Sequence, residues 1–316
     1  MEISVVIPEY GCREAVQELY RRLSDVLSAL VQEYEIIFVE DRDPQNSWED
    51  IRPLTEKDPH VKGIHFTRNF GQERAITAGL QYSTGNYVVV MDCDLQDRPE
   101  GIKELYELAL KGNDVVYVRR AERKDSAVTK FLSGMFYKVY NLLADDDYDP
   151  LIGNFSIASR RAVNSVLAMN ETNRGYIMFL KWLGYPSATI DIIADERAAG
   201  KSSYNLIKKI RYAIQEITSQ SNKPLWAAVY LGGFIAFVAF LVIVVLVVRH
   251  FIDGTIPEGW ISIMVGIYFM GGIVLSCLGI HGIYLGNVYN EVRSRPLYVI
   301  DEMKNLRETD SNGTEE

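Results

Sequence analysis

The hydrophobic pattern divides the chain into an alternating α/β part and a strongly apolar part. Up to about residue 118, short continuous apolar runs alternate with longer segments that repeat apolar residues at helical spacing. The apolar runs predict strands at 3–7, 35–40, 61–67, 87–91 and 114–118. The segments between them predict helices at 13–33, 47–58, 72–83 and 99–112. Short apolar strands joined by crossover helices predict a mostly parallel, Rossmann-like sheet that binds ligands at the carboxyl ends of its strands.

Two long segments near the C-terminus contain no Asp, Glu, Lys or Arg. These are residues 225–248 and 260–290. A helix over the first would be about 36 Å long, enough to cross a hydrocarbon core of about 30 Å. We therefore expect a hairpin of two transmembrane helices within 223–290, with a pair of buried core helices as the alternative. The preceding segment, 203–222, predicts an amphipathic helix on the inner leaflet, or else an ordinary domain-packing helix.

The charges that flank the apolar segments predict an orientation. Basic residues precede the first segment and follow the second, whereas the loop 249–258 holds one Arg and two acids. The positive-inside rule then places the α/β part and both termini in the cytoplasm, as a multi-pass protein of the inner (plasma) membrane. The tail 291–316 is expected to be cytoplasmic and frayed from residue 301 onward. The start of the chain lacks the pattern of a cleaved signal peptide.

Charge and cysteine content exclude several classes of function. The 316-residue chain has 33 basic and 42 acidic residues, a net charge of −9, which argues against nucleic-acid binding. Any anionic ligand must therefore meet a local basic cluster. The three cysteines are too few and too scattered for a disulfide framework or a thiolate metal site, so a reducing compartment is the simplest interpretation. A face of small residues at 271, 272, 276 and 279 leaves a homo-oligomer possible.

Polar residues stand at four predicted strand ends, and the segment 92–97 carries the most chemical information. It reads Asp92-Cys93-Asp94-Leu95-Gln96-Asp97 directly after an apolar strand. Two carboxylates and an amide at this spacing suit Mg²⁺ or Mn²⁺ held jointly with a diphosphate. A helix-capping role before Pro99 would explain Asp97 but not Asp92. Cys93 is expected on the opposite face of the strand, in the core.

Several motifs together resemble those of a known family. They are Val5-Val-Ile-Pro-Glu-Tyr10, Val39-Glu-Asp41, Arg68-Asn-Phe-Gly-Gln-Glu-Arg-Ala75, Asp92-Cys-Asp-Leu-Gln-Asp97, Arg119 to Arg123, and Arg197-Ala-Ala-Gly-Lys-Ser-Ser-Tyr204. The chain resembles the polyprenyl-phosphate glycosyltransferases of glycosyltransferase family 2, including the GtrB-like bactoprenol glucosyltransferases and the dolichol-phosphate mannose synthases. The resemblance implies an α/β catalytic domain of GT-A fold over residues 1–202.

The resemblance also implies roles for individual residues. Those implied to bind the nucleotide are Pro8, Tyr10, Asp41, Asn69, Gln72, Ala75 and Asp92. Those implied to hold the metal are Asp92, Asp94 and Gln96, and those with catalytic roles are Asp94, Asp97, Arg119 and Arg123. Those implied to bind the acceptor or a phosphate are Arg119, Arg123, Arg197 and Ser202. The chain departs from the family pattern at Gly11 and at Asp41-Arg-Asp43-Pro, which puts the base and ribose contacts in doubt. It departs again at Ser203, which leaves phosphate neutralisation more dependent on Arg197 and Lys201.

The activity implied by the resemblance is an inverting, metal-dependent transfer of a sugar from a nucleotide sugar to a lipid phosphate. UDP-glucose and undecaprenyl phosphate are the first choice, because two C-terminal spans resemble the bactoprenol branch. GDP-mannose as donor, or a catalytically dead nucleotide-sugar sensor in the membrane, are the alternatives. A processive polysaccharide synthase is disfavoured, because the Gln-x-x-Arg-Trp acceptor motif of such enzymes is absent from the sequence.

Overall fold

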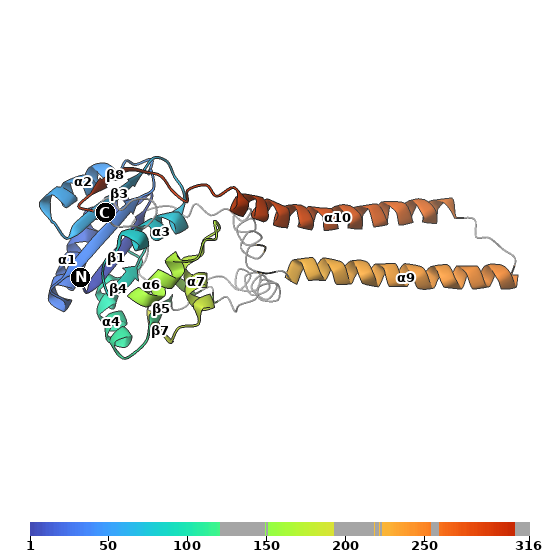
Figure 1. Cartoon of the computed structure of the whole chain (residues 1–316), viewed down its shortest axis with the longest axis horizontal. Helices are drawn as coiled ribbons and strands as arrows, with labels where there is room; N and C mark the ends of the chain where they lie inside the picture. Colours follow the sequence, from blue (N-terminus) through green and yellow to red (C-terminus); the bar gives the residue numbers. More distant parts are fainter. Residues whose placement is uncertain are drawn as a thin grey trace. The chain divides into compact units, whose positions relative to one another are not determined.

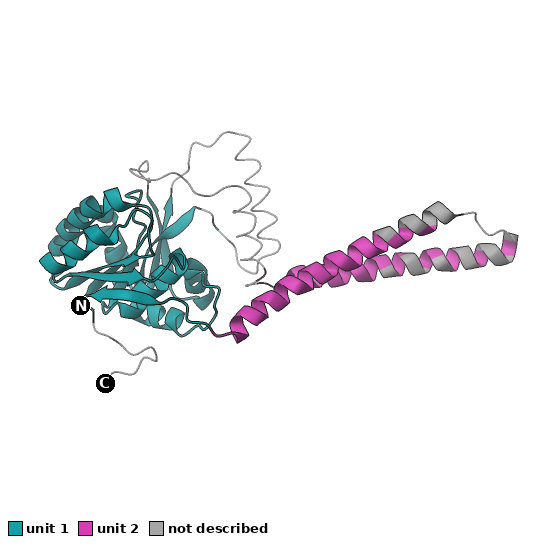
Figure 2. Ribbon diagram, turned by 90° about the horizontal axis from the view of Figure 1, so that it is seen from above, with its two compact units in different colours: residues 1–125, 149–203, 295–316 teal, residues 126–148, 204–294 magenta. Residues whose placement is uncertain are grey.

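The protein is described here by a computed structural model that covers residues 1–120, 149, 151–192, 218, 221, 223–253 and 259–306. The chain forms two compact units (Figure 2). Unit 1 comprises residues 1–125, 149–203 and 295–316, and unit 2 comprises residues 126–148 and 204–294. The predicted amphipathic helix 203–222, except for Thr218 and Ser221, lies outside the described residues.

Unit 1 is built on one sheet, whose described strands have the order β7-β5-β6-β4-β1-β2-β3-β8 (Figure 1). The strands are β1 Ile3–Glu9, β2 Tyr34–Glu40, β3 Val61–Phe66, β4 Tyr87–Val90, β5 Val115–Arg120, β6 Ile152–Ser159, β7 Ser187–Ile192 and β8 Ile300–Lys304. Strands β4, β1, β2 and β3 are parallel, as the apolar runs predicted. Strand β6 lies antiparallel between β4 and β5, so the sheet is mixed.

Helices cover both faces of this sheet and bury two apolar clusters. They are α1 Val16–Leu30, α2 Trp48–Lys57, α3 Gln72–Tyr82, α4 Ile102–Leu110, α6 Arg160–Leu167 and α7 Tyr176–Leu183, with short 3₁₀ turns at Arg13–Ala15 and Pro99–Gly101. Leu19 of α1 and Leu105 of α4 belong to one cluster, and Ile76 of α3 and Phe179 of α7 belong to the other. Strands β1 and β2 are buried at every position and β4 at all but its first, which is why their sequences are mostly apolar without regular alternation.

The C-terminal segment returns to the catalytic sheet, and the expectation that residues from 301 onward fray is wrong for residues 301–304. Strand β8 pairs antiparallel with β3, so that His65 lies opposite Glu302. Its contacts are specific: Trp48 Nε1 donates to Glu302 Oε2 at 2.8 Å, and Asn305 Nδ2 donates to the carbonyl of Val61 at 2.9 Å. The charged residues of β8 prevented its prediction as a strand, because an edge strand needs an apolar side chain only on its covered face.

Two of the three cysteines form a disulfide, which the sequence analysis did not foresee. Cys12 and Cys93 are joined with their Cα atoms 6.0 Å apart. Both are buried in the apolar cluster beside α1 and α4, so the expected core position of Cys93 is confirmed. The two residues are 81 positions apart, and only the parallel pairing of β1 with β4 brings them together.

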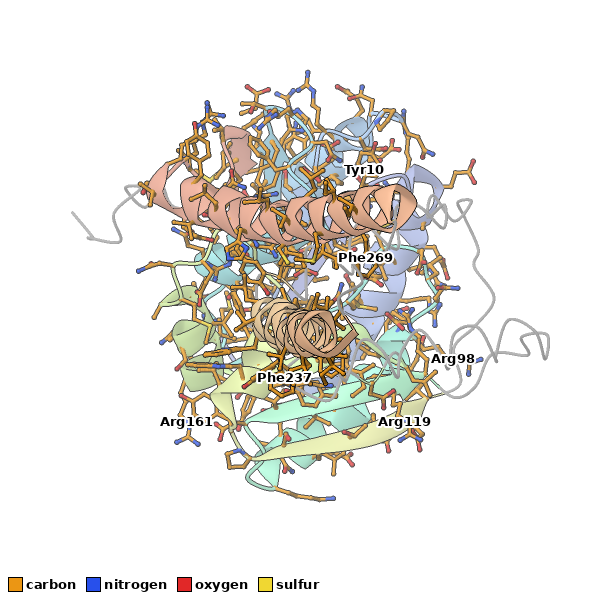
Figure 3. The ribbon with its side chains drawn as sticks, turned by 90° about the vertical axis from the view of Figure 1, so that its right-hand side faces the viewer. Tyr10, Arg98, Arg119, Arg161, Phe237 and Phe269 are labelled. Carbon is orange, nitrogen blue, oxygen red and sulfur yellow. A yellow bond between two sulfur atoms is a disulfide. The ribbon has the colours of Figure 1, made fainter. Side chains whose placement is uncertain are left out.

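Unit 2 contains two long helices, α9 Lys223–Asp253 and α10 Trp260–Val292 (Figure 1). Large apolar side chains project from both into the surroundings; Phe237 and Phe269 are 59% and 62% exposed (Figure 3). Within the described residues, one segment, Phe269–Val292, has the length and hydropathy of a membrane span. The second span therefore remains a prediction.

Strand β8 supplies a prediction about stability. A chain that ends after Pro296 would lack β8 and expose the hydrogen-bonding edge of β3 together with Trp48 and Phe66. We expect a clear fall in the thermal unfolding midpoint of the catalytic unit, followed by Trp fluorescence. The control is a chain that ends after Leu306, which keeps β8 and Asn305. Equal midpoints for the two truncated chains would contradict a structural role for β8.

Candidate active site

The candidate site lies at the carboxyl ends of β1, β2, β4 and β5, where the loops carry polar residues. Strand β4 ends at Val90 and delivers Asp92 and Asp94, each partly buried. Leu95 has a left-handed backbone, φ +60°, which turns the chain so that the backbone amide of Gln96 donates to Asp94 Oδ1 at 3.1 Å. Asp97 is 3% exposed. Three carboxylates therefore gather in a single short loop.

Arg120 supplies positive charge to these carboxylates. Its Nη2 lies 2.9 Å from Asp97 Oδ2 and 3.4 Å from Asp92 Oδ2. Gly153 on β6 leaves room for the guanidinium, because a Cβ at that position would lie 3.3 Å from Arg120 Cζ. Arg120 was not predicted as a site residue, whereas its neighbour Arg119 was. Side chains alternate along a strand, so the two arginines lie on opposite faces of the sheet.

Arg119 points elsewhere. Its Nε lies 3.1 Å from Asp191 Oδ1 on β7, and its side chain is 46% exposed. Figure 3 shows Arg119 beside β5 and β7. In this structure Arg119 forms a surface ion pair and does not contact the carboxylates of the 92–97 loop.

Burial dominates the electrostatics of this loop. It raises the pKa of Asp97 to about 6, although the adjacent Arg120 acts to lower it. Burial also raises the pKa of Asp92, and Arg120 and a hydrogen bond from Asn154 only partly offset the effect. Asp92 Oδ1 accepts a hydrogen bond from Gln72 Nε2 at 2.7 Å, so the structure brings together two residues that the sequence assigned to the nucleotide. The loop therefore combines three carboxylates with the guanidinium of Arg120.

The other predicted nucleotide residues fall into exposed and buried groups. Tyr10 is 49% exposed after β1, and Asn69 is exposed before α3. Pro8 is buried within β1, and Ala75 is fully buried on α3, so neither side chain is open to a ligand in this structure. Asp41 is 2% exposed.

Asp41 holds the loop that begins α3. Its two oxygens accept hydrogen bonds from the backbone amides of Phe70 and Gly71, at 2.6 and 2.7 Å. Burial nevertheless raises the pKa of Asp41 to about 6. This carboxylate therefore shapes the rim of the site, while the base or ribose contact implied by the resemblance stays a prediction.

A second group of buried carboxylates supports the loop after β1. Gly11 has φ +78° and donates its amide to Asp43 Oδ1 at 3.0 Å, and the Cys12 amide donates to Glu9 Oε1 at 3.1 Å. The other oxygen of Glu9 is buried and has no hydrogen-bond partner among the residues that the structure describes. Burial, with repulsion from Asp43, raises the pKa of Glu9 to about 7. The departures from the family at Gly11 and at Asp43 are therefore linked, since these two residues bond to each other.

Three predicted site residues, Arg123, Arg197 and Ser202, lie outside the described residues. Their roles remain predictions.

A mixed α/β sheet with an acidic D-x-D loop at the carboxyl end of a central parallel strand is the arrangement expected of a glycosyltransferase. The chain matches the model of the family "Glycosyl transferase family 2" over residues 4–167 and belongs to this family. The family resemblance inferred from the motifs is thereby confirmed.

Relatives resemble the chain over nearly its full length. It is 36% identical to the uncharacterized glycosyltransferase YkcC of Bacillus subtilis (strain 168), over 96% of this chain and 94% of the relative. It is 33% identical to a bactoprenol glucosyl transferase of Shigella phage SfX, over 96% of this chain and 100% of the relative. Among solved structures, glucosyl-3-phosphoglycerate synthase from Mycobacterium tuberculosis, crystallised with Mn²⁺ and uridine-diphosphate-glucose, is similar with a TM-score of 0.47 and 18% identity, over 69% of this chain and 77% of that one.

The raised pKa of Glu9 predicts how stability depends on pH. The unfolded chain ionises Glu9 near pH 4.5, but the folded chain keeps it neutral to about pH 7. The contribution of Glu9 to the free energy of unfolding is therefore fully present below about pH 4.5 and is lost as the pH rises to about 7. Glu9→Gln stays neutral, so its unfolding midpoint should rise relative to the wild type across this range by several degrees. Glu14→Gln, at an exposed position, is the control. A constant difference between Glu9→Gln and the wild type would contradict the prediction.

The two neighbouring arginines give a second prediction. Arg120→Ala removes a charged hydrogen-bonding partner from buried Asp97, so we expect sugar transfer to fall by about 10- to 150-fold and the unfolding midpoint to drop. Arg119→Ala breaks a surface pair and should lower the midpoint little, because such pairs contribute below about 1 kcal/mol. Unfolding midpoints and transfer rates of the two variants are the measurements. An Arg120→Ala enzyme with wild-type rate and midpoint would contradict the assignment.

Proposed function

We propose that the enzyme transfers glucose from UDP-glucose to undecaprenyl phosphate, with inversion at the sugar C1. The observation that carries the proposal is the cluster of three carboxylates in the loop 92–97, set at the strand ends of a family 2 glycosyltransferase. The full-length similarity to proteins named bactoprenol glucosyl transferase supports the choice of sugar and lipid.

The donor set of this loop fits a divalent cation, Mg²⁺ or Mn²⁺. Asp92, Asp94 and Gln96 would hold the ion, because hard cations prefer carboxylate and amide oxygens. Among the described residues no three His, Cys, Asp or Glu side chains form a complete metal cage, so donor diphosphate and water must supply the other ligands. The ion would stabilise the charge of the departing nucleoside diphosphate.

The nucleotide is proposed to lie across the loops after β1, β2 and β4. Exposed Tyr10 offers an aromatic face for the base, and exposed Asn69 and Gln72 offer amides. Pro8, Asp41 and Ala75 are proposed to line the pocket from beneath through the backbone that they position. Asp92 would contact both the ribose and the metal.

The acceptor phosphate is proposed to meet arginines at the end of β5. The clamp implied by the resemblance consists of Arg119 and Arg123, with Arg197 and Ser202 closing over phosphate. The geometry favours adding Arg120, since its guanidinium already lies within the acidic loop. A planar guanidinium can bind two phosphate oxygens and leave the third free.

The proposed reaction is a single displacement. An oxygen of the acceptor phosphate, largely anionic near pH 7, attacks the sugar C1 while the bond from C1 to the diphosphate oxygen breaks. A donor with an α-linked sugar would therefore give a β-linked lipid phosphate. No strong general base is needed, so the task of the protein is to align the acceptor and to stabilise charge. Asp94 would act through the metal, and Asp97 would face the sugar.

The proposed setting is the cytoplasmic leaflet of the inner (plasma) membrane. Helix α10 contains a segment of sufficient length and hydropathy, and α9 carries exposed Phe237 and Leu241. We propose that both helices span the bilayer, with the catalytic unit and both termini in the cytoplasm. The small-residue face at 271–279 is a proposed contact between copies of the chain.

The function is tested by incubating purified full-length protein with undecaprenyl phosphate and a panel of radiolabelled nucleotide sugars. UDP-glucose should give a labelled lipid, and GDP-mannose and the other UDP-sugars should give less. A different preferred donor would replace the proposed sugar. Absence of labelled lipid with every donor would overturn the proposal and favour the sensor alternative.

Metal dependence gives a more specific prediction. Asp94→Ala should remove nearly all transfer, because a metal ligand is lost where the diphosphate must bind, and Asp92→Asn should weaken donor binding as well. Removal of divalent cations by a chelator should abolish wild-type transfer, and Mg²⁺ or Mn²⁺ should restore it. Asp25→Asn, at an exposed position of α1, is the control. Full activity of the Asp94 variant in chelator would exclude a metal site here.

The topology predicts which positions can be labelled from outside the cell. A cysteine at position 254, in the loop between the apolar segments, should react with an impermeant maleimide in intact cells. A cysteine at position 310 should react only after permeabilisation. Both experiments require Cys277→Ser as the background. The reverse pattern would contradict the two-span arrangement.

A further inference from the structure

The disulfide between Cys12 and Cys93 joins the two loops that form the proposed donor site. Cys12 follows Tyr10 and Gly11 in the loop after β1, and Cys93 stands between Asp92 and Asp94. The register of β1 with β4 ends at the pair Val6 and Val90, followed by a hydrogen bond from the Met91 amide to the carbonyl of Val6 at 3.2 Å. The disulfide thus extends the connection between these strands beyond the end of their ladder.

The bond lies behind the site and not in it. Cys12 and Cys93 are 7% and 6% exposed and belong to the apolar cluster beneath α1 and α4. Asp92 and Asp94, the residues on either side of Cys93, make contacts with Gln72 and with the Gln96 amide. A ligand that binds these carboxylates has no need to touch sulfur, so the disulfide can act only by fixing the loops.

Hydrogen bonds also hold the loop after β1. The backbone amides of Gly11 and Cys12 donate to Asp43 and Glu9, and the carbonyl of Cys12 accepts from the Ala15 amide at 2.8 Å. Tyr10, two residues from Cys12, is 49% exposed. Opening the bond would remove a covalent restraint from this loop and from the loop 92–97 together.

We propose that Cys12 and Cys93 are a reversible thiol–disulfide site that couples the β1 loop to the D-x-D loop and favours donor binding in the oxidised state. The proposal goes beyond the proposed transfer reaction. The oxidised protein should bind nucleotide more tightly than the reduced protein, because loops that are already ordered lose less entropy on binding.

The oxidant is proposed to be a peroxide. The Cys12 sulfur attacks hydrogen peroxide, the O–O bond breaks, and a sulfenic acid and one water form. The Cys93 sulfur then attacks the Cys12 sulfur, the S–O bond breaks, the S–S bond forms and a second water leaves. Two thiols and one peroxide thus give one disulfide and two waters. A dithiol reverses the change by two exchange steps and is itself oxidised to a disulfide.

The test uses full-length protein in lipid nanodiscs, treated with hydrogen peroxide or with dithiothreitol and then freed of reagent. Differential alkylation and mass spectrometry should find a peptide pair linked through Cys12 and Cys93 after peroxide, and two free thiols after dithiothreitol. Hydrogen exchange should be slower in the oxidised form at residues 10–13 and 92–97. Absence of the linked pair, or equal exchange in the two forms, would overturn the proposal.

Variants separate the bond from general effects of oxidation. Cys12→Ser and Cys93→Ala should each give the fast exchange of the reduced form under both treatments. Cys277→Ser keeps the pair and should still respond like the wild type. A Cys12→Ser protein that still responds to peroxide at residues 92–97 would exclude Cys12 from the mechanism.

Nucleotide binding is measured separately, with UDP-glucose and Mg²⁺. We expect affinity to be roughly three- to tenfold higher in the oxidised form than in the reduced form. Equal affinities would remove the donor-binding part of the proposal. If UDP-glucose binds to neither form, the proposed donor is wrong, and the affinity comparison is made with the donor that the panel identifies, while the exchange data decide the coupling of the loops.

Discussion

The compensation of buried negative charge at the strand ends is the constraint on which this site depends. Asp92, Asp94 and Asp97 follow one another within six positions after a strand with no polar side chain. Arg120 reaches two of them, Asp92 and Asp97. Buried carboxylates are costly unless they pair with cations or take up protons, so their clustering favours a site that holds positive charge. This is the physical reason to place a divalent ion and a diphosphate here.

The second group of carboxylates meets the same constraint in another way. Asp41 and Asp43 accept backbone amides of neighbouring loops, and Glu9 has its pKa raised to about 7. Their hydrogen bonds to backbone amides make Asp41, Asp43 and Glu9 supports for the loops, whereas Asp92 and Asp97 are contacted by the side chains of Gln72 and Arg120. Position in the sheet alone does not separate the two groups, because both stand at strand ends. Their hydrogen-bond partners separate them.

The sequence predicted the parallel core of the sheet and the D-x-D loop well, because both rest on local patterns. A strand buried on both faces is apolar throughout, and its end is marked by the first carboxylates. It did not predict β6, β8 or the disulfide. Strand β8 depends on pairing with a strand more than 230 positions away, and the Cys12–Cys93 bond depends on the neighbouring positions of β1 and β4. Arg120 was not among the predicted site residues, because side-chain direction depends on which face of β5 is turned to the site.

The segment that joins the sheet to α10 is short. Helix α10 ends at Val292 and β8 begins at Ile300, eight positions later. Strand β8 is fixed to β3 by a backbone ladder and by the hydrogen bond from Trp48 to Glu302. A soluble domain on a long linker would search for a lipid headgroup through a large volume. A short and anchored connection to the proposed membrane helix therefore suits the proposed acceptor, which is confined to a leaflet, better than a long linker does.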